Sequence, residues 1–385
     1  MCIRDRPTVT PIPTATVPNI NSVGARIRLY PRSSAPDLTL GGGIAPQAPH
    51  AKSVLYTPDP RYVAEDTLTD TGPGPPGPLS GLPTRPELAR RRPIAVIIDN
   101  FDPDARPQAG LNRASVVFEA VAEGGITRFM AIYLEKDAPI VGPVRSARIY
   151  FDAWASGLAA IYAHAGGNSD ALLELPKLPS IANVDGLGGG APNPFPWDLY
   201  WRSTDRLAPH NLYTATDHLR AYADATMHAA TGLIPPSLPH KDPAAWLVRP
   251  SGGWIHIAFS TDSYSVQYHY DPHCNCYPRS MNGVAHADAF SLRQIAPSNV
   301  AVLFAGVVAD PASDTPGSVN VQSRGLGRAL YFRDGQVTAG SWRKDSTTAP
   351  LTFLDAQGQP LAFNPGQTWV SIVPIGNSVT WQTHK

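Results

Sequence analysis

The stretch RRPIAVIIDN, residues Arg91–Asn100, decides the fold. Its centre, Ile94–Ile98, is a continuous apolar run rich in β-branched side chains, which is the pattern of a buried strand. Two polar residues, Asp99 and Asn100, close this strand at a potential crevice edge. The stretch therefore predicts a buried strand that ends in polar groups, and the ordered part of the chain is expected to begin here.

Strand and helix patterns alternate within Val141–Leu178. A helix is predicted over 145–160, with Ser146 as its N-cap. Its buried face is expected to carry Ile149, Trp154 and Leu158. The strand IYAHAGG follows, and then a short helix capped by Ser169. This alternation predicts an α/β layer with at least one parallel strand pair, and a further helix pair is expected in 215–230.

From about Ala244 the chain is predicted to form a β-rich second domain. Strand-like runs are separated there by turn signals such as RDGQ and DAQGQ, whose glycines accept a positive φ. The expected fold class is an α/β or α+β N-terminal domain with a mixed sheet over 87–232, followed by a β-rich C-terminal domain over 244–376.

The front of the chain has a different composition. Residues 7–86 are rich in Pro, Thr and Gly, which predicts a disordered tether because such a segment buries too little apolar surface to fold. A spacer at a cell surface and an ordinary interdomain linker both fit this composition.

Residues 1–6, MCIRDR, are interpreted as an adapter or cloning scar, because their back-translation matches the end of a library-preparation transposon. Cys2 lacks the preceding apolar run that a lipidation signal requires. We therefore expect the true N-terminus and any export signal to be missing from this sequence.

Composition and motifs give no support for a nucleic-acid-binding protein, a membrane-spanning protein or several common enzyme classes. The 385 residues have a formal net charge of zero, which gives no argument for nucleic-acid binding. No stretch approaches 18 consecutive apolar residues, so no membrane span is expected. The sequence also contains no GxSxG, HExxH or P-loop motif, and no cofactor is predicted.

A series of ordered motifs resembles the YerB-like family, DUF3048, of bacterial extracytoplasmic lipoproteins. The N-terminal half carries PLSGLPT, RPIAVIIDN, ARPQAGL, EGGITRFMAIY, GPVRSAR, HAGG and APHNLYT, and the C-terminal half carries GLGRALYFRDGQV, GSWRK, PLTF and NPGQTWVSIVP. The resemblance covers roughly Pro78–Pro374. It implies export and a lipid anchor at the outer face of the cytoplasmic membrane, and it implies no particular chemistry.

Arg145 and Arg148 in GPVRSAR are the leading binding candidates. If Ser146 caps the helix, these arginines flank a helix N-terminus, which favours an anion. Guanidinium groups add bidentate donors for carboxylate or phosphate. Pairing of the same arginines with acidic residues of neighbouring strands is the alternative.

Glu119 and Glu123 are candidates for an acid/base pair. Residues four apart share one face on a helix or a strand, and two like charges there raise one pKa. Such a pair suits a glycoside hydrolase, with His164 assisting. Neutralisation by Arg128, Arg145 or Arg148 is the alternative.

Further polar residues are expected to gather at strand ends and loops. His164 ends a strand, where open α/β sheets line a crevice. The other predicted ligand-binding residues are Asp99, Asn100, Arg106, Gln108, Arg128, Asp185, Arg202, His210, Asn211 and His286.

The segment around Cys274 and Cys276 has a spacing that argues against zinc, because CxC is not the usual CxxC. No metal site is predicted, although His273 and His286 lie nearby in sequence. A turn whose two thiols are oxidised outside the cell fits better. His286 is expected to reach the first domain across the domain interface.

Three functions remain open from the sequence. The first is an envelope lipoprotein that binds an anionic ligand, such as a cell-wall fragment, through Arg106, Arg145, Arg148 and Arg202. The second is a hydrolase of envelope polymer that uses Glu119 and Glu123. The third is an envelope scaffold without a small ligand, which would require the arginines and glutamates to be fully paired and sealed from solvent.

Overall fold

The computed structural model describes residues 67–69, 71–188, 198–229, 237–311 and 313–384. The predicted scar and most of the predicted tether, residues 1–66, lie outside the described residues.

The ordered part of the chain begins before residue 86, the predicted end of the tether. Leu79 is buried, and the backbone N–H groups of Leu79 and Ser80 both donate to Glu135 Oε1 at 2.9 Å. A buried carboxylate therefore fixes this segment to the domain ahead of Ile94.

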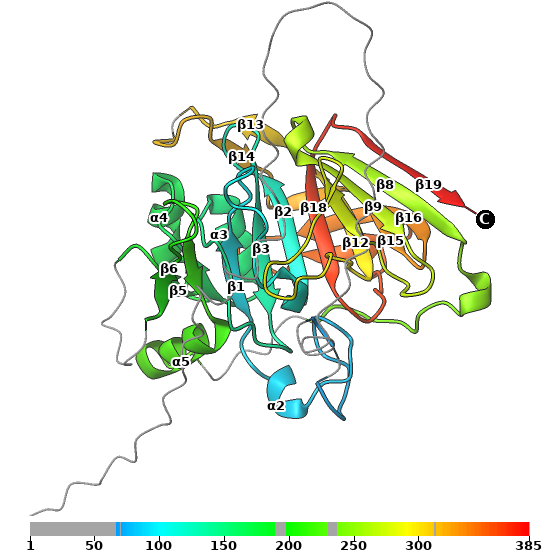
Figure 1. Ribbon diagram of the computed structural model, residues 1–385, viewed down its shortest axis with the longest axis horizontal. Coiled ribbons are helices and arrows are strands. Elements are labelled where there is room, and N and C mark those ends of the chain that lie inside the picture. Colours follow the sequence, from blue (N-terminus) through cyan, green and yellow to red (C-terminus); the bar gives the residue numbers. More distant parts are fainter. Residues whose placement is uncertain (1–66, 70, 189–197, 230–236, 312, 385) are drawn as a thin grey trace, which may run out of the picture.

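A mixed ten-stranded sheet forms the centre of the molecule (Figure 1), in the order β17-β16-β15-β12-β18-β2-β3-β1-β4-β5. Its strands in chain order are β1 (Ile94–Ile98), β2 (Val116–Val121), β3 (Thr127–Tyr133), β4 (Ile161–His164), β5 (Ala182–Asp185), β12 (Asn299–Ala305), β15 (Gly325–Arg333), β16 (Gln336–Lys344), β17 (Thr352–Asp355) and β18 (Thr368–Pro374).

Parallel and antiparallel pairs coexist in this sheet, as the predicted fold class requires. β4 runs parallel to both β1 and β5, which confirms the predicted parallel pair. β18 runs parallel to β12 and to β2, and aligns Trp369 with Val117 and Ser371 with Glu119. The pairing of β18 with β2 joins strands from both halves of the chain, so the two predicted domains share one sheet.

A second sheet of five strands has the order β11-β10-β9-β8-β19. Its members are β8 (Gly252–Ala258), β9 (Ser265–Tyr270), β10 (Arg279–Met281), β11 (Val284–Ala285) and β19 (Val379–His384). Two small ribbons pair β6 (Tyr200–Arg202) with β7 (Leu212–Thr214) and β13 (Val307–Ala309) with β14 (Val319–Val321).

The helices are short. They are α2 (Pro86–Ala89), α3 (Ile149–Gly157), α4 (Ser169–Glu174) and α5 (Thr216–Met227), with 3₁₀ turns at Leu111–Arg113, Leu175–Lys177, Trp246–Val248 and Asp262–Tyr264. Among the described residues, none of them has the length and apolar character needed to cross a membrane.

The predicted helix starts need correction. The N-cap of α3 is Arg148, not Ser146, and the N-cap of α4 is Asn168, not Ser169. The segment from 145 to 147 is extended instead and pairs with the sheet, because Arg145 N donates to Ile97 O at 2.9 Å. The described part of 215–230 forms one helix, α5, where a pair was expected.

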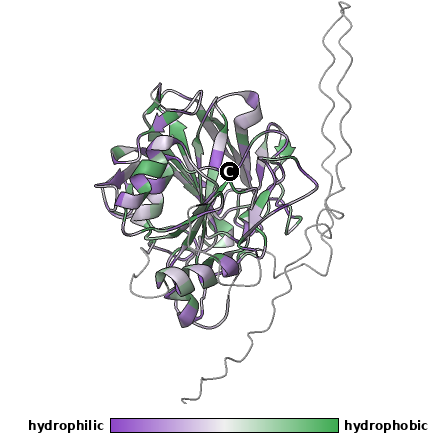
Figure 2. Cartoon of the chain, turned by 90° about the vertical axis from the view of Figure 1, so that its left-hand side faces the viewer, coloured by the Kyte–Doolittle hydropathy of each residue, from purple (hydrophilic) through white to green (hydrophobic). Residues whose placement is uncertain are grey.

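Both faces of the large sheet are covered around β1. On one face, Ile94, Val96 and Ile98 belong to a core that includes residues of α5 and of the five-stranded sheet. On the other, Ala95 and Ile97 pack in a core with residues of α3 and α4. The hydrophobic run of β1 is thus explained by burial on both sides, and Figure 2 shows hydrophobic strands inside and hydrophilic residues on the outer helix surfaces.

We expect Ile97→Ala to lower the free energy of unfolding by about 2–5 kcal/mol, because it leaves a cavity in a fully buried strand. The matched substitution Ile375→Ala, at a side chain that is 68% exposed, should change it by less than about 0.5 kcal/mol. Chemical denaturation of both variants measures the difference, and equal effects would contradict this assignment of the core.

Candidate functional site

The segment GPVRSAR is inserted between the carboxyl ends of β1 and β4. Val144 bridges Ile98 at the end of β1, and Ala147 bridges Gly167 just beyond β4. Ala165 N donates to Arg145 O at 2.9 Å. This placement brings Arg145 to the strand ends where open α/β sheets bind ligands.

Glu123 is the centre of an arginine cluster beside this segment. Its two carboxylate oxygens accept hydrogen bonds from Arg128 and, at 2.7 Å, from Arg148. Burial raises the pKa of Glu123, but Arg128, Arg148 and Arg145 outweigh burial and hold the pKa at about 2. Glu123 is therefore an ionised counter-charge for the arginines at neutral pH.

Arg145 is the arginine of this cluster with the longest ion pair and the most exposed side chain. Its Nε lies 3.4 Å from Asp99 Oδ2, and among the described residues none accepts a hydrogen bond from this Nε. The side chain is 28% exposed, whereas those of Arg128 and Arg148 are only 1% and 4% exposed. Burial and the nearby charge of Arg128 lower the pKa of Arg145.

Asp99 is the nearest carboxylate to Arg145, and it also has other partners. Its Oδ2 lies 2.7 Å from Nδ1 of His210, and its Oδ1 accepts a hydrogen bond from the backbone N–H of Phe101 at 3.1 Å. Phe101 also stacks on His210, with ring centroids 4.8 Å apart. Three guanidinium groups thus share two carboxylates.

Glu119 lies in a different environment, inside a closed hydrogen-bonded ring. Arg279 Nη2 donates to Glu119 Oε2 at 2.6 Å, and both side chains are fully buried. Trp369 Nε1 donates to the same oxygen at 3.1 Å, and Thr127 Oγ1 donates to Glu119 Oε1 at 3.0 Å. The Glu119 carboxylate is therefore shielded from solvent.

The rest of the ring connects Thr127 back to Arg279. Asn100 Nδ2 donates to Thr127 Oγ1 at 2.7 Å, and Gln108 Nε2 donates to Asn100 Oδ1 at 2.9 Å. His286 Nε2 lies 2.8 Å from Gln108 Oε1, and its Nδ1 faces Arg279 Nη1. Burial, together with Arg279 and Arg106, lowers the pKa of His286 well below its usual value, so the imidazole of His286 is neutral. A neutral imidazole can accept from Arg279 and donate to Gln108, which gives every bond in the ring a donor and an acceptor.

Two comparisons with known proteins agree on the family. Residues 79–229 match the family described as "Protein of unknown function (DUF3048) N-terminal domain", and residues 255–370 match the corresponding C-terminal domain. The chain is 32% identical over 315 residues to "Putative lipoprotein YerB" of Bacillus subtilis (strain 168). The aligned region covers 80% of this chain and 89% of that protein.

The chain belongs to the DUF3048 family.

A solved structure shares the DUF3048 fold. The crystal structure of the YerB protein from Bacillus subtilis matches with a TM-score of 0.67 and 30% identity, over 79% of this chain and 99% of that one. The resemblance inferred from the motifs is confirmed.

The remaining predicted residues of this DUF3048 chain hold loops in place. His164 is buried, with Nδ1 2.8 Å from Gly166 O and Nε2 2.7 Å from Asn183 Oδ1. Asp185 Oδ1 accepts from the N–H groups of Gly166 and Leu187. Both side chains are thus bonded to neighbouring loop and strand residues, and neither bonds to Arg145.

Arg202 and Arg106 also have protein partners. Arg202 Nη1 donates to Asn211 Oδ1 at 2.7 Å, and Asn211 Nδ2 in turn donates to Ser203 O at 2.9 Å. Arg106 Nε donates to Asn100 Oδ1 at 2.9 Å, and its Nη2 donates to Ser263 O in the C-terminal half. Of the four predicted anion-binding arginines, Arg145 is therefore the one best placed to accept a new partner.

The sequence predicted His286 at the domain interface. It gave no sign of Arg279 and Thr127, which close the ring, or of Trp369, which donates to Glu119 from outside it. No motif marks Arg279 in the sequence, since a single arginine in a predicted hairpin is ordinarily exposed.

Cys274 and Cys276 form a disulfide with a Cα–Cα distance of 5.2 Å, as the interpretation of this segment as an oxidised turn expects. Within the described ranges, no group of three or more His, Cys, Asp or Glu side chains is arranged to hold a metal ion.

We expect Arg279→Met to lower the free energy of unfolding by about 3–5 kcal/mol, because it leaves Glu119 buried without a counter-charge. The double variant Glu119→Leu/Arg279→Met should lose less than the sum of the two single variants, since it removes both charges. A double-mutant cycle by chemical denaturation measures this coupling, and additive losses would refute a direct ion pair.

We expect the stability supplied by Glu123 to depend on pH. A folded-state pKa of about 2 against an ordinary 4.5 makes Glu123 worth on the order of 3 kcal/mol above pH 4.5, and this contribution is lost as the pH falls towards 2. The difference in unfolding free energy between the native chain and Glu123→Gln should therefore be constant from about pH 6 to 8 and shrink below about pH 4.5. A difference that does not change with pH would contradict the arginine cluster.

Proposed function

We propose that this DUF3048 protein is an exported envelope protein, anchored by a lipid, that binds a small anionic ligand at Arg145. The proposed location rests on its similarity to a protein named as a lipoprotein. The proposed ligand is a carboxylate or phosphate group, such as that of a cell-wall fragment.

The single observation that carries the binding proposal is that the guanidinium of Arg145 is only partly compensated, by a carboxylate 3.4 Å away. This guanidinium is partly exposed, next to two other arginines, and its nearest carboxylate, Asp99, is already bonded to His210. An anion that replaces water at Arg145 would gain a planar bidentate donor and relieve the repulsion among the three guanidinium groups.

The hydrolase interpretation gains little from the geometry. Glu119 is sealed in the ring, and Glu123 is held ionised by two arginines, so neither is poised to donate a proton to a substrate. A scaffold function has one specific observation in its favour, because the sealed ring joins the two halves of the chain through Glu119 and Arg279.

Thermal unfolding of the full chain with N-acetylmuramyl dipeptide and with glucose 6-phosphate tests the binding proposal. A ligand present at a hundred times its Kd should stabilise the native state by about 2.7 kcal/mol and raise the midpoint of unfolding. We expect Arg145→Ala to abolish this shift without lowering the midpoint of the ligand-free protein by more than a few degrees.

Arg343→Ala is the matched control, because Arg343 is 57% exposed and paired with Asp345 on the surface. It should keep the ligand-induced shift. No shift with either compound, or a shift that survives Arg145→Ala, would favour the scaffold.

A further inference from the structure

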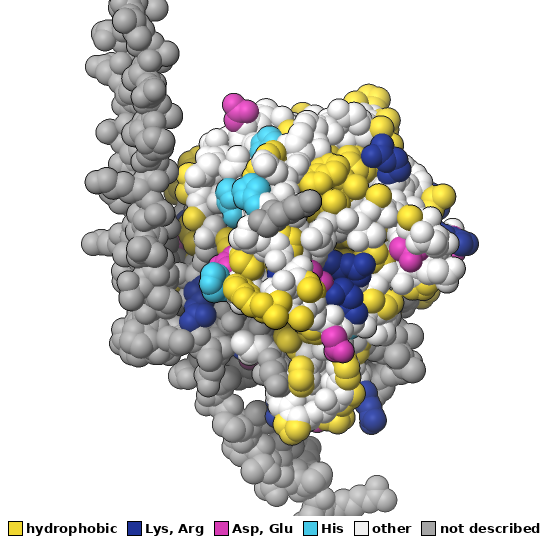
Figure 3. Space-filling model, turned by 90° about the vertical axis from the view of Figure 1, so that its right-hand side faces the viewer, with side chains coloured by type: hydrophobic (Ala, Val, Ile, Leu, Met, Phe, Trp, Pro, Cys, Tyr) yellow, Lys and Arg dark blue, Asp and Glu magenta, His cyan; other side chains and the backbone are white. Residues whose placement is uncertain are grey.

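The five-stranded sheet has a solvent-facing side that no other described element covers. Alternation along β8 and β9 sends Ile255, Ile257, Val266 and Tyr268 into the core. The residues between them therefore point outwards. Figure 3 shows histidine side chains gathered beside hydrophobic ones on this face of the molecule.

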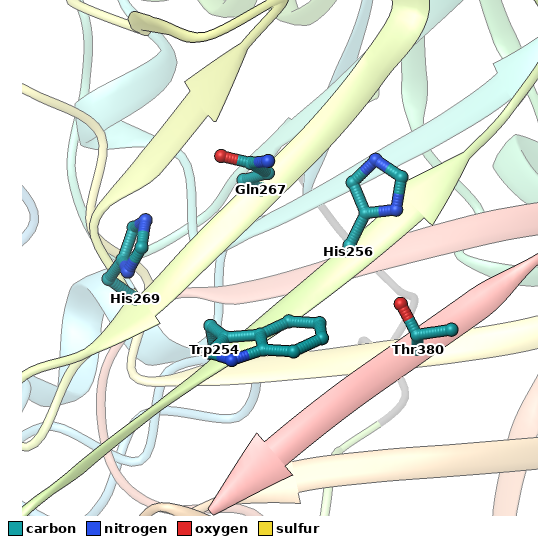
Figure 4. Close-up of a pocket in the computed structure, with 5 residues that line it drawn as sticks. All are labelled: Trp254, His256, Gln267, His269 and Thr380. Atoms are coloured by element: carbon teal, nitrogen blue, oxygen red, sulfur yellow. The ribbon is translucent and has the colours of Figure 1, made fainter. Parts of the chain in front are cut away.

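The strand register arranges the outward side chains in two rows. One row runs His269–Trp254–Gln382 across β9, β8 and β19, and the next runs Gln267–His256–Thr380. In a sheet, neighbouring strands are about 4.8 Å apart and every second residue of a strand is about 6.8 Å further along, so the two rows lie side by side. They surround an open depression of about 300 Å³ lined by Trp254, His256, Gln267, His269 and Thr380 (Figure 4).

The chemistry of this depression selects against charged ligands. None of its five lining residues is a Lys, Arg, Asp or Glu. The amide, the hydroxyl and the imidazole rings can each donate and accept hydrogen bonds, and the indole of Trp254 adds a flat apolar surface.

Two of the rings are already held in place. Trp254 Nε1 donates to Gln382 Oε1 at 3.1 Å, and His256 Nε2 lies 2.7 Å from Ser265 Oγ. Binding therefore costs little additional side-chain entropy at these positions.

We propose that this face binds a neutral oligosaccharide, with one sugar ring packed on Trp254 and its hydroxyl groups bonded to Gln267, His256, His269 and Thr380. A sugar ring presents an apolar C–H face and an edge of hydroxyls that both donate and accept, which matches an uncharged polar rim around an indole. The site is separate from Arg145, and neither proposal depends on the other.

A protein partner fits this surface less well. Three exposed large apolar side chains, Leu326, Ile375 and Trp381, line a different depression. An interface core is depleted of polar groups relative to its rim, whereas this depression has polar side chains at four of five positions.

Isothermal titration of the full chain with chitotetraose and with cellotetraose tests the proposal. We expect at least one of the two to bind, and Trp254→Ala to weaken it by about tenfold or more. Gln267→Ala, at an exposed position where folding is not at risk, should also weaken binding severalfold. The matched control is Trp246→Ala, since Trp246 is 51% exposed and lies against His273, outside this face.

The outcomes separate clearly. Binding that depends on Trp254 and Gln267 but not on Trp246 or Arg145 supports the site. No binding of either tetrasaccharide overturns it, as does binding that Gln267→Ala and Trp254→Ala leave unchanged. Self-association that Gln267→Ala abolishes would assign the face to a second copy of the chain.

Discussion

The buried ion pair between Glu119 and Arg279 is the constraint on which the arrangement of the two halves depends. Glu119 lies on β2 in the centre of the large sheet, and Arg279 lies on β10 of the other sheet. A buried charge without its partner is strongly unfavourable, so the five-stranded sheet must pack where Arg279 reaches Glu119. Trp369, 4.5 Å from the Arg279 guanidinium, stacks on the same pair from β18.

Glu119 and Glu123 are only four residues apart, yet they lie in different environments. Glu119 lies inside the sheet and has one arginine, one indole and one hydroxyl as partners. Glu123 lies beyond the end of β2, just before the turn at Gly124 and Gly125, where both glycines have a positive φ. It therefore reaches a partly exposed arginine cluster. The expected shared acid/base pair does not form, because each carboxylate is neutralised by its own arginines.

The two polar clusters differ in exposure, since the ring around Glu119 is buried and the Arg145 side chain is 28% exposed. The ring that contains Asn100, Gln108 and His286 is complete, and a complete buried network favours a single arrangement of the chain. The Arg145 cluster has three guanidinium groups and two carboxylates at the ends of β1 and β4, and the face around Trp254 has uncharged polar groups.

The sequence by itself determined the class of fold, the family and the polar ends of the first strand, because hydrophobic periodicity and ordered motifs are local properties. It predicted Arg145 at the start of a helix, whereas Ser146 does not cap α3 and the segment is an extended insertion between β1 and β4. Only the tertiary structure decided which charges are neutralised. Glu119 and Arg279 are 160 residues apart, and β2 and β18 pair across most of the chain, so their contact follows from packing and from no local pattern.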